Sequence, residues 1–151
     1  MTIIAFDLSL SNTGIAIFND TGDWIESLSV DTKKESNYSL KLRKIEKAFK
    51  QLKKKYKPSV IVIEESFTRF NKSTQAIYRV RGIAELVFYD VEQVCYHATS
   101  VRKEVLGHGN AKKEDLQRFI LDNYKNSIFS DMDQSDAFGL AICYFKKKGI
   151  L

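Results

Sequence analysis

The chain has 151 residues, of which 44% are hydrophobic and 28% are charged, a composition that predicts one globular domain over residues 1–151. Its net charge of +5 permits a polyanionic partner without requiring one. No apolar run approaches the ~18 residues that span a bilayer, and the two cysteines lack zinc-binding spacing, so we expect no membrane insertion and a reducing, cytoplasmic location.

Five short segments have the composition of β-strands. Residues 2–7, 13–19 and 24–30 come first, and a hairpin turn precedes the third of them. Residues 59–65 (SVIVIEE) are β-branched without alternation, which is typical of a strand covered on both faces. A last short strand is expected at residues 92–97.

Helices alternate with the later strands. Apolar residues recur at steps of three and four over residues 37–56 and 73–90, and the lysines of the first of these helices are interpreted as its solvated face. Shorter helices are expected at 99–106, after a cap at Asn110, and from about 133 to 148. This order predicts an α/β fold in which helices flank a mixed five-stranded sheet.

Acidic residues end two of the predicted strands. Asp7 ends the first strand and Glu64 the fourth, so the two acids meet at one edge if these strands are parallel neighbours. Asp133 and Asp136 lie three residues apart on one face of the last helix. Because no basic residue in these segments could offset the charges, and carboxylate oxygens suit Mg²⁺ or Mn²⁺, we expect a site for two ions.

Each acid also has a purely structural explanation. Asp133 could cap the helix, with Asp136 in its first turn. Asp7 could accept hydrogen bonds from the turn that follows it, and Glu64 could enter solvent at its strand end. Taken together, four acids at three convergence points favour a metal site. Glu65 competes with Glu64, because only the strand register decides which of them faces the other acids.

Four features are spread over nearly the whole chain: Asp7 with Gly14 seven residues later, IEESF (63–67), GHGNAKKEDL (107–116) and DQSDAFGLAI (133–142). Together they resemble the RuvC family of Holliday-junction resolvases, which belongs to the RNase H-like superfamily. The resemblance implies an RNase H-like fold and a magnesium-dependent endodeoxyribonuclease. Such an enzyme resolves Holliday junctions or other branched DNA by paired nicks that leave 5′-phosphate and 3′-hydroxyl ends.

The resemblance also implies roles for particular residues. The catalytic, metal-binding carboxylates correspond to Asp7, Glu64, Asp133 and Asp136, with two Mg²⁺ ions per site and Mn²⁺ as a substitute. Lys113 and Arg102 match two basic residues that are important for catalysis, and Phe67 matches an aromatic side chain that stacks or wedges at the crossover. The resemblance further implies a homodimer that presents two active sites to a four-way junction, and leaves open whether a helicase is a partner.

Several further residues could contact DNA. Lys112 and Lys113 fall in the first turn of the helix expected after Asn110, where the helix dipole disfavours cations unless an anion is bound. Cations and aromatic residues mix over residues 67–81, as in surfaces that bind phosphates and stack bases. The alternatives are that the lysines simply extend into water and that Phe67 belongs to the core. The residues expected to bind DNA are Phe67, Arg69, Lys72, Arg79 and Lys112.

The sequence departs from the family at two places, and three other functions are alternatives. Asp7 is followed by Leu8-Ser9 where the family usually has Pro-Gly, and Arg102 replaces a usual lysine, which would suit a phage-encoded relative. One rival is an RNase H-like nuclease acting on RNA–DNA hybrids, and another is a junction-binding protein without catalysis. The third is an actin-like ATPase, because residues 7–14 also resemble the first phosphate loop of that superfamily. The chain is too short, however, to form the two lobes that clamp the nucleotide in such ATPases.

Overall fold

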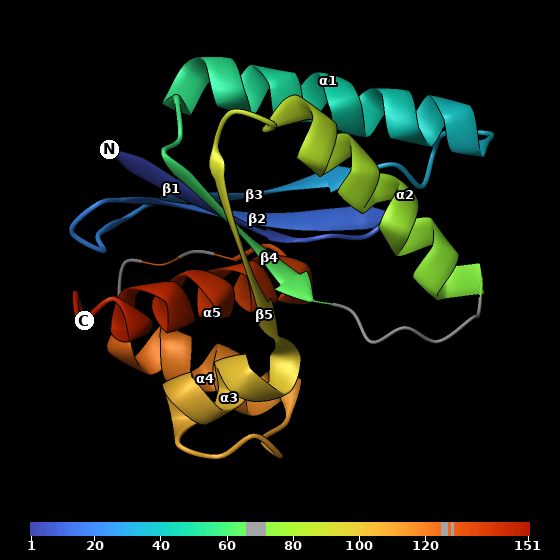
Figure 1. Cartoon of the computed structure of the whole chain (residues 1–151). Coiled ribbons are helices and arrows are strands. Elements are labelled where there is room, and N and C mark those ends of the chain that lie inside the picture. Colours follow the sequence, from blue (N-terminus) through green and yellow to red (C-terminus); the bar gives the residue numbers. More distant parts are fainter. Residues whose placement is uncertain (66–71, 125–126, 128) are drawn as a thin grey trace.

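The computed structural model of the chain describes residues 1–65, 72–124, 127 and 129–151 (Figure 1). All the predicted strands and helices are present. In chain order they are β1 (Thr2–Asp7), β2 (Asn12–Asn19), β3 (Trp24–Asp31), α1 (Tyr38–Tyr56), β4 (Val60–Glu65), α2 (Lys72–Val87), β5 (Glu92–His97), α3 (Ala98–Leu106), α4 (Lys113–Asn123) and α5 (Met132–Lys147).

The five strands form one mixed sheet, as the sequence predicts. Their order is β3-β2-β1-β4-β5, in which β1 pairs antiparallel with β2 and parallel with β4. β4 and β5 are also parallel, whereas β2 and β3 are antiparallel. Because β1 and β4 are parallel neighbours, their carboxyl ends meet at the same edge of the sheet.

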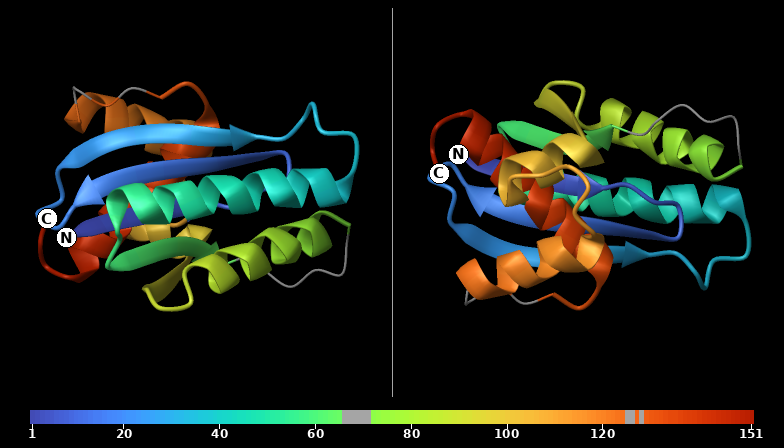
Figure 2. Two further views of the ribbon diagram at one scale, coloured as in Figure 1. Left: turned by 90° about the horizontal axis from the view of Figure 1, so that it is seen from above. Right: turned by 90° about the horizontal axis from the view of Figure 1, so that it is seen from below.

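Helices cover both faces of this sheet. α1 and α2 pack on one face, and α5 packs on the other with α3 and α4 beyond it (Figures 1 and 2). Side chains of β1 alternate between the two cores: Ile4 and Phe6 face α1 and α2, and Ile3 and Ala5 face α5. The same alternation turns Asp7 toward α5, and coverage on both faces explains why the strand reads as one apolar run.

The end of α2 differs from its prediction. The helix ends at Val87, and residues 88–90 form a turn in which the Val91 amide donates to the Phe88 carbonyl at 3.0 Å. Phe88 is fully buried against α1 even so. The apolar pattern of the sequence extends past the end of the helix, since the turn also contributes a side chain to the core. This explains why the predicted helix was too long.

Within the described segments, no helix combines the length and the apolar character needed to cross a membrane.

Candidate active site

The carboxylate of Asp7 lies at the centre of the sheet edge where β1 ends. Asp7 is paired with Gly14 of β2, and the preceding residue, Phe6, is paired with Ile63 of β4. Its side chain points to the face that α5 covers. The site is therefore built where a central strand, its parallel neighbour and the start of α5 come together.

Gly14 allows α5 to approach the sheet at this point. A Cβ atom on Gly14 would lie 2.1 Å from the carbonyl oxygen of Asp133 and 2.7 Å from the amide nitrogen of Gln134. Both contacts are with backbone, which cannot turn aside as a flexible side chain would. Only glycine therefore lets the first turn of α5 rest directly on β2, beside Asp7.

This close approach gathers three carboxylates. One oxygen from each of Asp7, Asp133 and Asp136 lies within 4.8 Å of the others. Asp133 and Asp136 occupy positions i and i+3 of α5, so both face the end of β1. Oxygen donors at this spacing suit Mg²⁺ or Mn²⁺.

The strand register distinguishes Glu64 from Glu65. Val60 and Val62 belong to the core on the α5 face, so alternation places Glu64 on that face too. Glu65 faces the other way, and one of its carboxylate oxygens lies 3.1 Å from Nη1 of Arg81. Glu64 adjoins the cluster, since its charge raises the pKa of Asp7, but it is not among the three acids that meet within 4.8 Å.

The acids of this edge repel one another. Burial, followed by the charges of Glu64 and Asp136, raises the pKa of Asp7 well above its usual value. Burial, followed by the charge of Asp136, also raises the pKa of Glu64, and burial raises the pKa of Asp136 itself. Each shift means that the charged form is disfavoured here, so the donor set fits a divalent cation, which would compensate the charges.

One cation reaches the cluster from α4. The ammonium of Lys113 forms an ion pair with the carboxylate of Asp136, and this pairing opposes the rise in the pKa of Asp136. Asp136 is buried, whereas Lys113 remains half exposed. The basic partner that the strands and the start of α5 lack is therefore supplied by a different helix, and it still faces solvent where a phosphate could bind.

The start of α4 differs from the expected cap at Asn110. The N-cap residue is Lys112, whose backbone amide donates to the carboxylate of Asp115 at 2.9 Å. Glu114 and Asp115 provide the acidic first turn, which the helix dipole favours. Lys113 is thus the first helical residue, and the exposed Lys112 lies just before it.

Arg102 lies on α3 on the same side of the sheet. Its charge lowers the pKa values of both Glu64 and Asp136, which places the guanidinium within electrostatic reach of two of the acids. Arg102 is half buried, and α3 starts directly after β5, whose last residue His97 is paired with Glu65. Two cations, Arg102 and Lys113, therefore flank the carboxylates.

The sequence interpretation missed Asp131, which fixes the start of α5 next to the site. Its carboxylate caps α5 by accepting from the Gln134 amide at 2.9 Å, and it accepts from Ser29 at 2.6 Å and from Asn12 at 3.1 Å. Burial alone would raise the pKa of Asp131, but these hydrogen bonds outweigh burial and lower it. The cap is therefore Asp131, so the capping explanation of Asp133 is wrong.

Asn12 links this cap to the cluster. Its side-chain amide donates to Asp133 at 2.7 Å as well as to Asp131. Asn12 is 8% exposed, so the contact is shielded from water. An aspartate close to the start of a predicted helix is a capping signal that could have identified Asp131, whereas nothing local in the sequence marks Asn12.

The residues expected to bind DNA are more widely spread. Lys72 and Arg79, both exposed on α2, line a shallow pocket of about 300 Å³ with Tyr38 of α1, and Arg79 stacks on the Tyr38 ring at 4.8 Å. Phe67 and Arg69 lie outside the described residues. Nε of Arg81 lies 3.0 Å from a carboxylate oxygen of Glu85, so Arg81 pairs with both Glu85 and Glu65.

Comparison with known proteins gives one consistent result. The sequence matches the family described as "Crossover junction endodeoxyribonuclease RuvC" over residues 3–144. It is 30% identical to the protein of that name from Herminiimonas arsenicoxydans over 95% of this chain and 83% of the relative. It is 33% identical to that from Ehrlichia ruminantium, over 95% of this chain and 96% of the relative.

Solved structures share the fold at lower identity. Thermus thermophilus RuvC superimposes with a TM-score of 0.83 at 17% identity, over 99% of this chain and 97% of that one. A structure of T. thermophilus RuvC in complex with Holliday junction substrate gives a TM-score of 0.84 at 16% identity, over 99% and 97% of the two chains. The Holliday junction resolvase of fowlpox virus gives 0.55 at 19% identity, over 98% and 99%.

Proposed function

Because the chain belongs to the RuvC family of crossover junction endodeoxyribonucleases, we propose that it resolves four-way DNA junctions by hydrolysing phosphodiester bonds. The observation that carries this proposal is the convergence of Asp7, Asp133 and Asp136 within 4.8 Å at the edge of the sheet. Carboxylates that can hold divalent ions serve metal-dependent phosphodiester hydrolysis, and basic residues beside them can offset charge on the phosphate.

The family implies dependence on a divalent metal, and we propose Mg²⁺, with Mn²⁺ as a substitute and two ions per site. The residues that would hold them are Asp7, Glu64, Asp133 and Asp136. When bound, the metal would ease ionisation of the attacking water and stabilise the leaving 3′ oxygen. The charges of Glu64, Asp136 and Asp133 all raise the pKa of Asp7, so Asp7 is the residue that would contribute to holding both ions.

The two flanking cations have a separate role in this proposal. Lys113, held by Asp136 and half exposed, would bind the scissile phosphate and offset the charge that develops on it. Arg102 would lower the repulsion between Glu64 and Asp136 when no metal is bound and assist Lys113 at the phosphate. The products would carry 5′-phosphate and 3′-hydroxyl ends.

Contacts with the DNA arms would come from residues around this edge. Lys72 and Arg79 share one pocket and are both exposed, which supports their contact with phosphates, and Lys112 adjoins Lys113. Stacking by Phe67 at the crossover and phosphate contact by Arg69 stay predictions from the family resemblance.

We also propose that the active form is a homodimer joined through α2. The outer face of this helix exposes Tyr78 and Leu86, which are 39% and 69% exposed. Between them lies Gly82, and a Cβ there would meet nothing within 4 Å in this chain. Because glycine in a helix costs about 1 kcal/mol relative to alanine, close approach by a second copy would explain its presence.

The dimer is tested by light scattering after size exclusion. Leu86→Glu should shift the mass from two copies to one, whereas Leu121→Glu, an exposed leucine on α4, should leave the dimer intact. A wild-type protein that is monomeric at micromolar concentration would contradict the proposal.

One domain over residues 1–151, a bacterial cytoplasmic location and a phage-encoded origin stay predictions.

The nuclease proposal is tested with a labelled four-way junction, a matched linear duplex and an RNA–DNA hybrid, each with magnesium or EDTA. We expect paired nicks on opposing strands of the junction, in magnesium only. Glu64→Gln should slow cleavage by about 100-fold or more, the scale seen when a charge-stabilising group is removed from an active site.

Glu65→Gln is the matched control, because the adjacent residue makes the same chemical change on the opposite face of the sheet. It should cleave junctions at nearly the wild-type rate. Preferential cleavage of the hybrid would contradict the junction proposal. Binding of the junction without nicks in either magnesium or manganese would favour a non-catalytic protein.

A further inference from the structure

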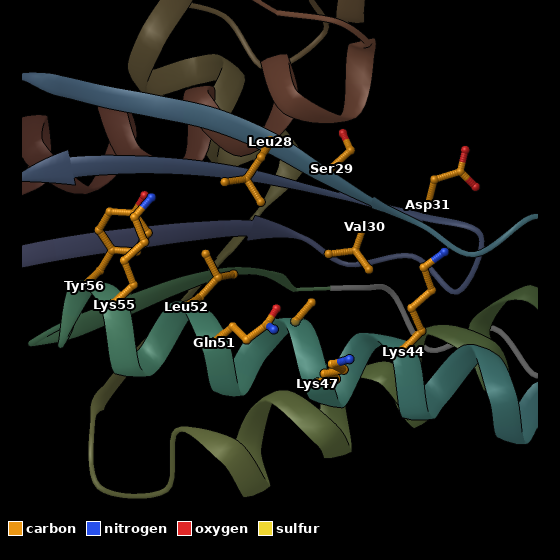
Figure 3. A pocket seen from close by; sticks show the side chains of 11 residues that line it. Leu28, Ser29, Val30, Asp31, Lys44, Lys47, Gln51, Leu52, Lys55 and Tyr56 are labelled. Atoms are coloured by element: carbon orange, nitrogen blue, oxygen red, sulfur yellow. The ribbon is translucent and has the colours of Figure 1, made fainter.

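A second surface of the molecule lies away from the carboxylates. Between β3 and α1 runs a groove of about 710 Å³, on the sheet face opposite α5 (Figure 3). Its floor is aliphatic: Leu28 and Val30 point from β3 toward α1, which contributes Leu52. Ala48 of α1 also lines the groove. Nothing in the proposed cleavage reaction uses this groove.

The rim of the groove is basic. Lys44, Lys47 and Lys55 line it from α1, and a single acid, Asp31, lines it from β3. This helix carries eight of the 24 basic residues and one of the 19 acids, a net charge of +7, so the rest of the chain sums to −2. The positive excess of the protein therefore belongs to this helix and not to the carboxylate edge.

Two rim lysines are paired with acids of this chain, but weakly. Lys44 lies 3.2 Å from Glu35 and Lys55 lies 2.9 Å from Glu26, with both lysines well exposed. Exposed ion pairs contribute little to stability, so a carboxylate from outside can replace the internal partner at small cost. Lys47 forms no ion pair with the described residues.

The groove lies at the edge of the sheet. β3 is the edge strand, and within the described part of the chain no strand pairs with its outer side. Because β3 has no neighbouring strand on that side among the described residues, the groove is open along the outer side of β3, and an extended segment can enter it from there.

We propose that this groove binds an extended acidic segment of a partner protein. Alternate side chains of an extended segment point to opposite sides, so apolar ones can fill the floor over Leu28 and Leu52 while acidic ones reach Lys44, Lys47 and Lys55. This binding goes beyond junction cleavage and does not depend on it.

The chemistry of the groove favours this occupant over two others. A second copy of the chain related by two-fold symmetry would place the basic rim of α1 against itself, which like charges oppose. Single-stranded nucleic acid binds by stacking bases on aromatic side chains, whereas this floor is aliphatic and has Tyr56 at one end only. An acidic peptide with apolar side chains matches both the floor and the rim.

The test measures fluorescence anisotropy of a labelled peptide that alternates aspartate with leucine and phenylalanine. We expect saturable binding that weakens about tenfold for Lys47→Glu. The same peptide with serine in place of every apolar residue should also bind about tenfold more weakly. Lys54→Glu is the matched control, because it makes the same charge change on α1 outside the groove and should alter the affinity less than about twofold.

Three results would overturn the proposal. One is the absence of saturation at millimolar peptide. Another is equal weakening by Lys47→Glu and Lys54→Glu, which would mean attraction by overall charge alone. The third is a labelled single-stranded oligonucleotide that binds more tightly than the peptide and with the same dependence on Lys47. Junction cleavage by Lys47→Glu should equal that of the wild type, which separates this groove from the active site.

Discussion

Replacing Asp7 with asparagine should make the metal-free protein more stable. The substitution keeps the shape of the side chain but removes a charge that burial and the neighbouring acids disfavour. Two unit charges 4.8 Å apart repel by roughly 3.5 kcal/mol at an effective dielectric constant of about 20. Because partial protonation relieves some of this repulsion, we expect a gain of about 2 kcal/mol, or about 4–8 °C in Tm.

The assay is thermal unfolding of wild type and Asp7→Asn in EDTA and in magnesium. Magnesium should raise the Tm of the wild type and have little effect on the variant, because the variant lacks a central ligand. Glu65→Gln, whose carboxylate faces Arg81, should respond to magnesium as the wild type does. A lower Tm for Asp7→Asn in EDTA would refute the reasoning, as would an undiminished response to magnesium.

The stability of the metal-free protein should also depend on pH in a definite direction. A carboxyl whose pKa is higher in the folded protein than in the unfolded chain favours folding while it is protonated. Its contribution is fully present below the unfolded pKa, near 4, and is lost as pH rises through the folded pKa. The raised pKa values of Asp7, Glu64 and Asp136 therefore predict that the metal-free wild type loses stability above about pH 4, and that Asp7→Asn loses less.

Three further predictions concern the elements that assemble the site. Gly14→Ala should lower the free energy of unfolding by about 1–3 kcal/mol and reduce junction cleavage, because its Cβ would strike the backbone of α5; a denaturant titration showing wild-type stability would contradict this. Lys113→Met should raise the pKa of Asp136 further and move the acidic limb of the cleavage profile to higher pH, whereas an unmoved limb would exclude their coupling. Asp131→Ala should cost about 1 kcal/mol as a lost helix cap, measured by the same titration, and should weaken magnesium binding by freeing Asn12; unchanged values for both would show that the cap is dispensable.

Periodicity and composition were sufficient for the elements of the fold. The strands that became β1 and β4 were recognisable because burial on both faces demands continuous β-branched residues, and α1 because one helical face must be apolar. Element ends were less certain. The end of α2 was predicted too late, because Phe88 extends the apolar pattern although it lies in the turn after the helix. The N-cap of α4 is Lys112 and not Asn110, because the carboxylate of Asp115 accepts a hydrogen bond from the Lys112 amide.

The candidate site was only partly visible in the sequence. Residue type and position at strand ends selected Asp7 and the Glu64–Glu65 pair, because a charge next to a buried strand needs compensation. The choice of Glu64 required the register of β4, which pairing with β1 fixes through contacts far apart in the chain. Asn12, which holds both Asp131 and Asp133, carried no local signal at all.

The sequence by itself determined which chemistry is present: the acids, the basic residues beside them, and the order of strands and helices that brings carboxyl ends to one edge. Only the tertiary structure decided which groups meet, because the contacts of Gly14 with α5 and of Lys113 with Asp136 join different elements of the chain. Local sequence patterns reflect the burial and capping of a single helix or strand. A site or a groove depends on distances between elements, and those are set by packing.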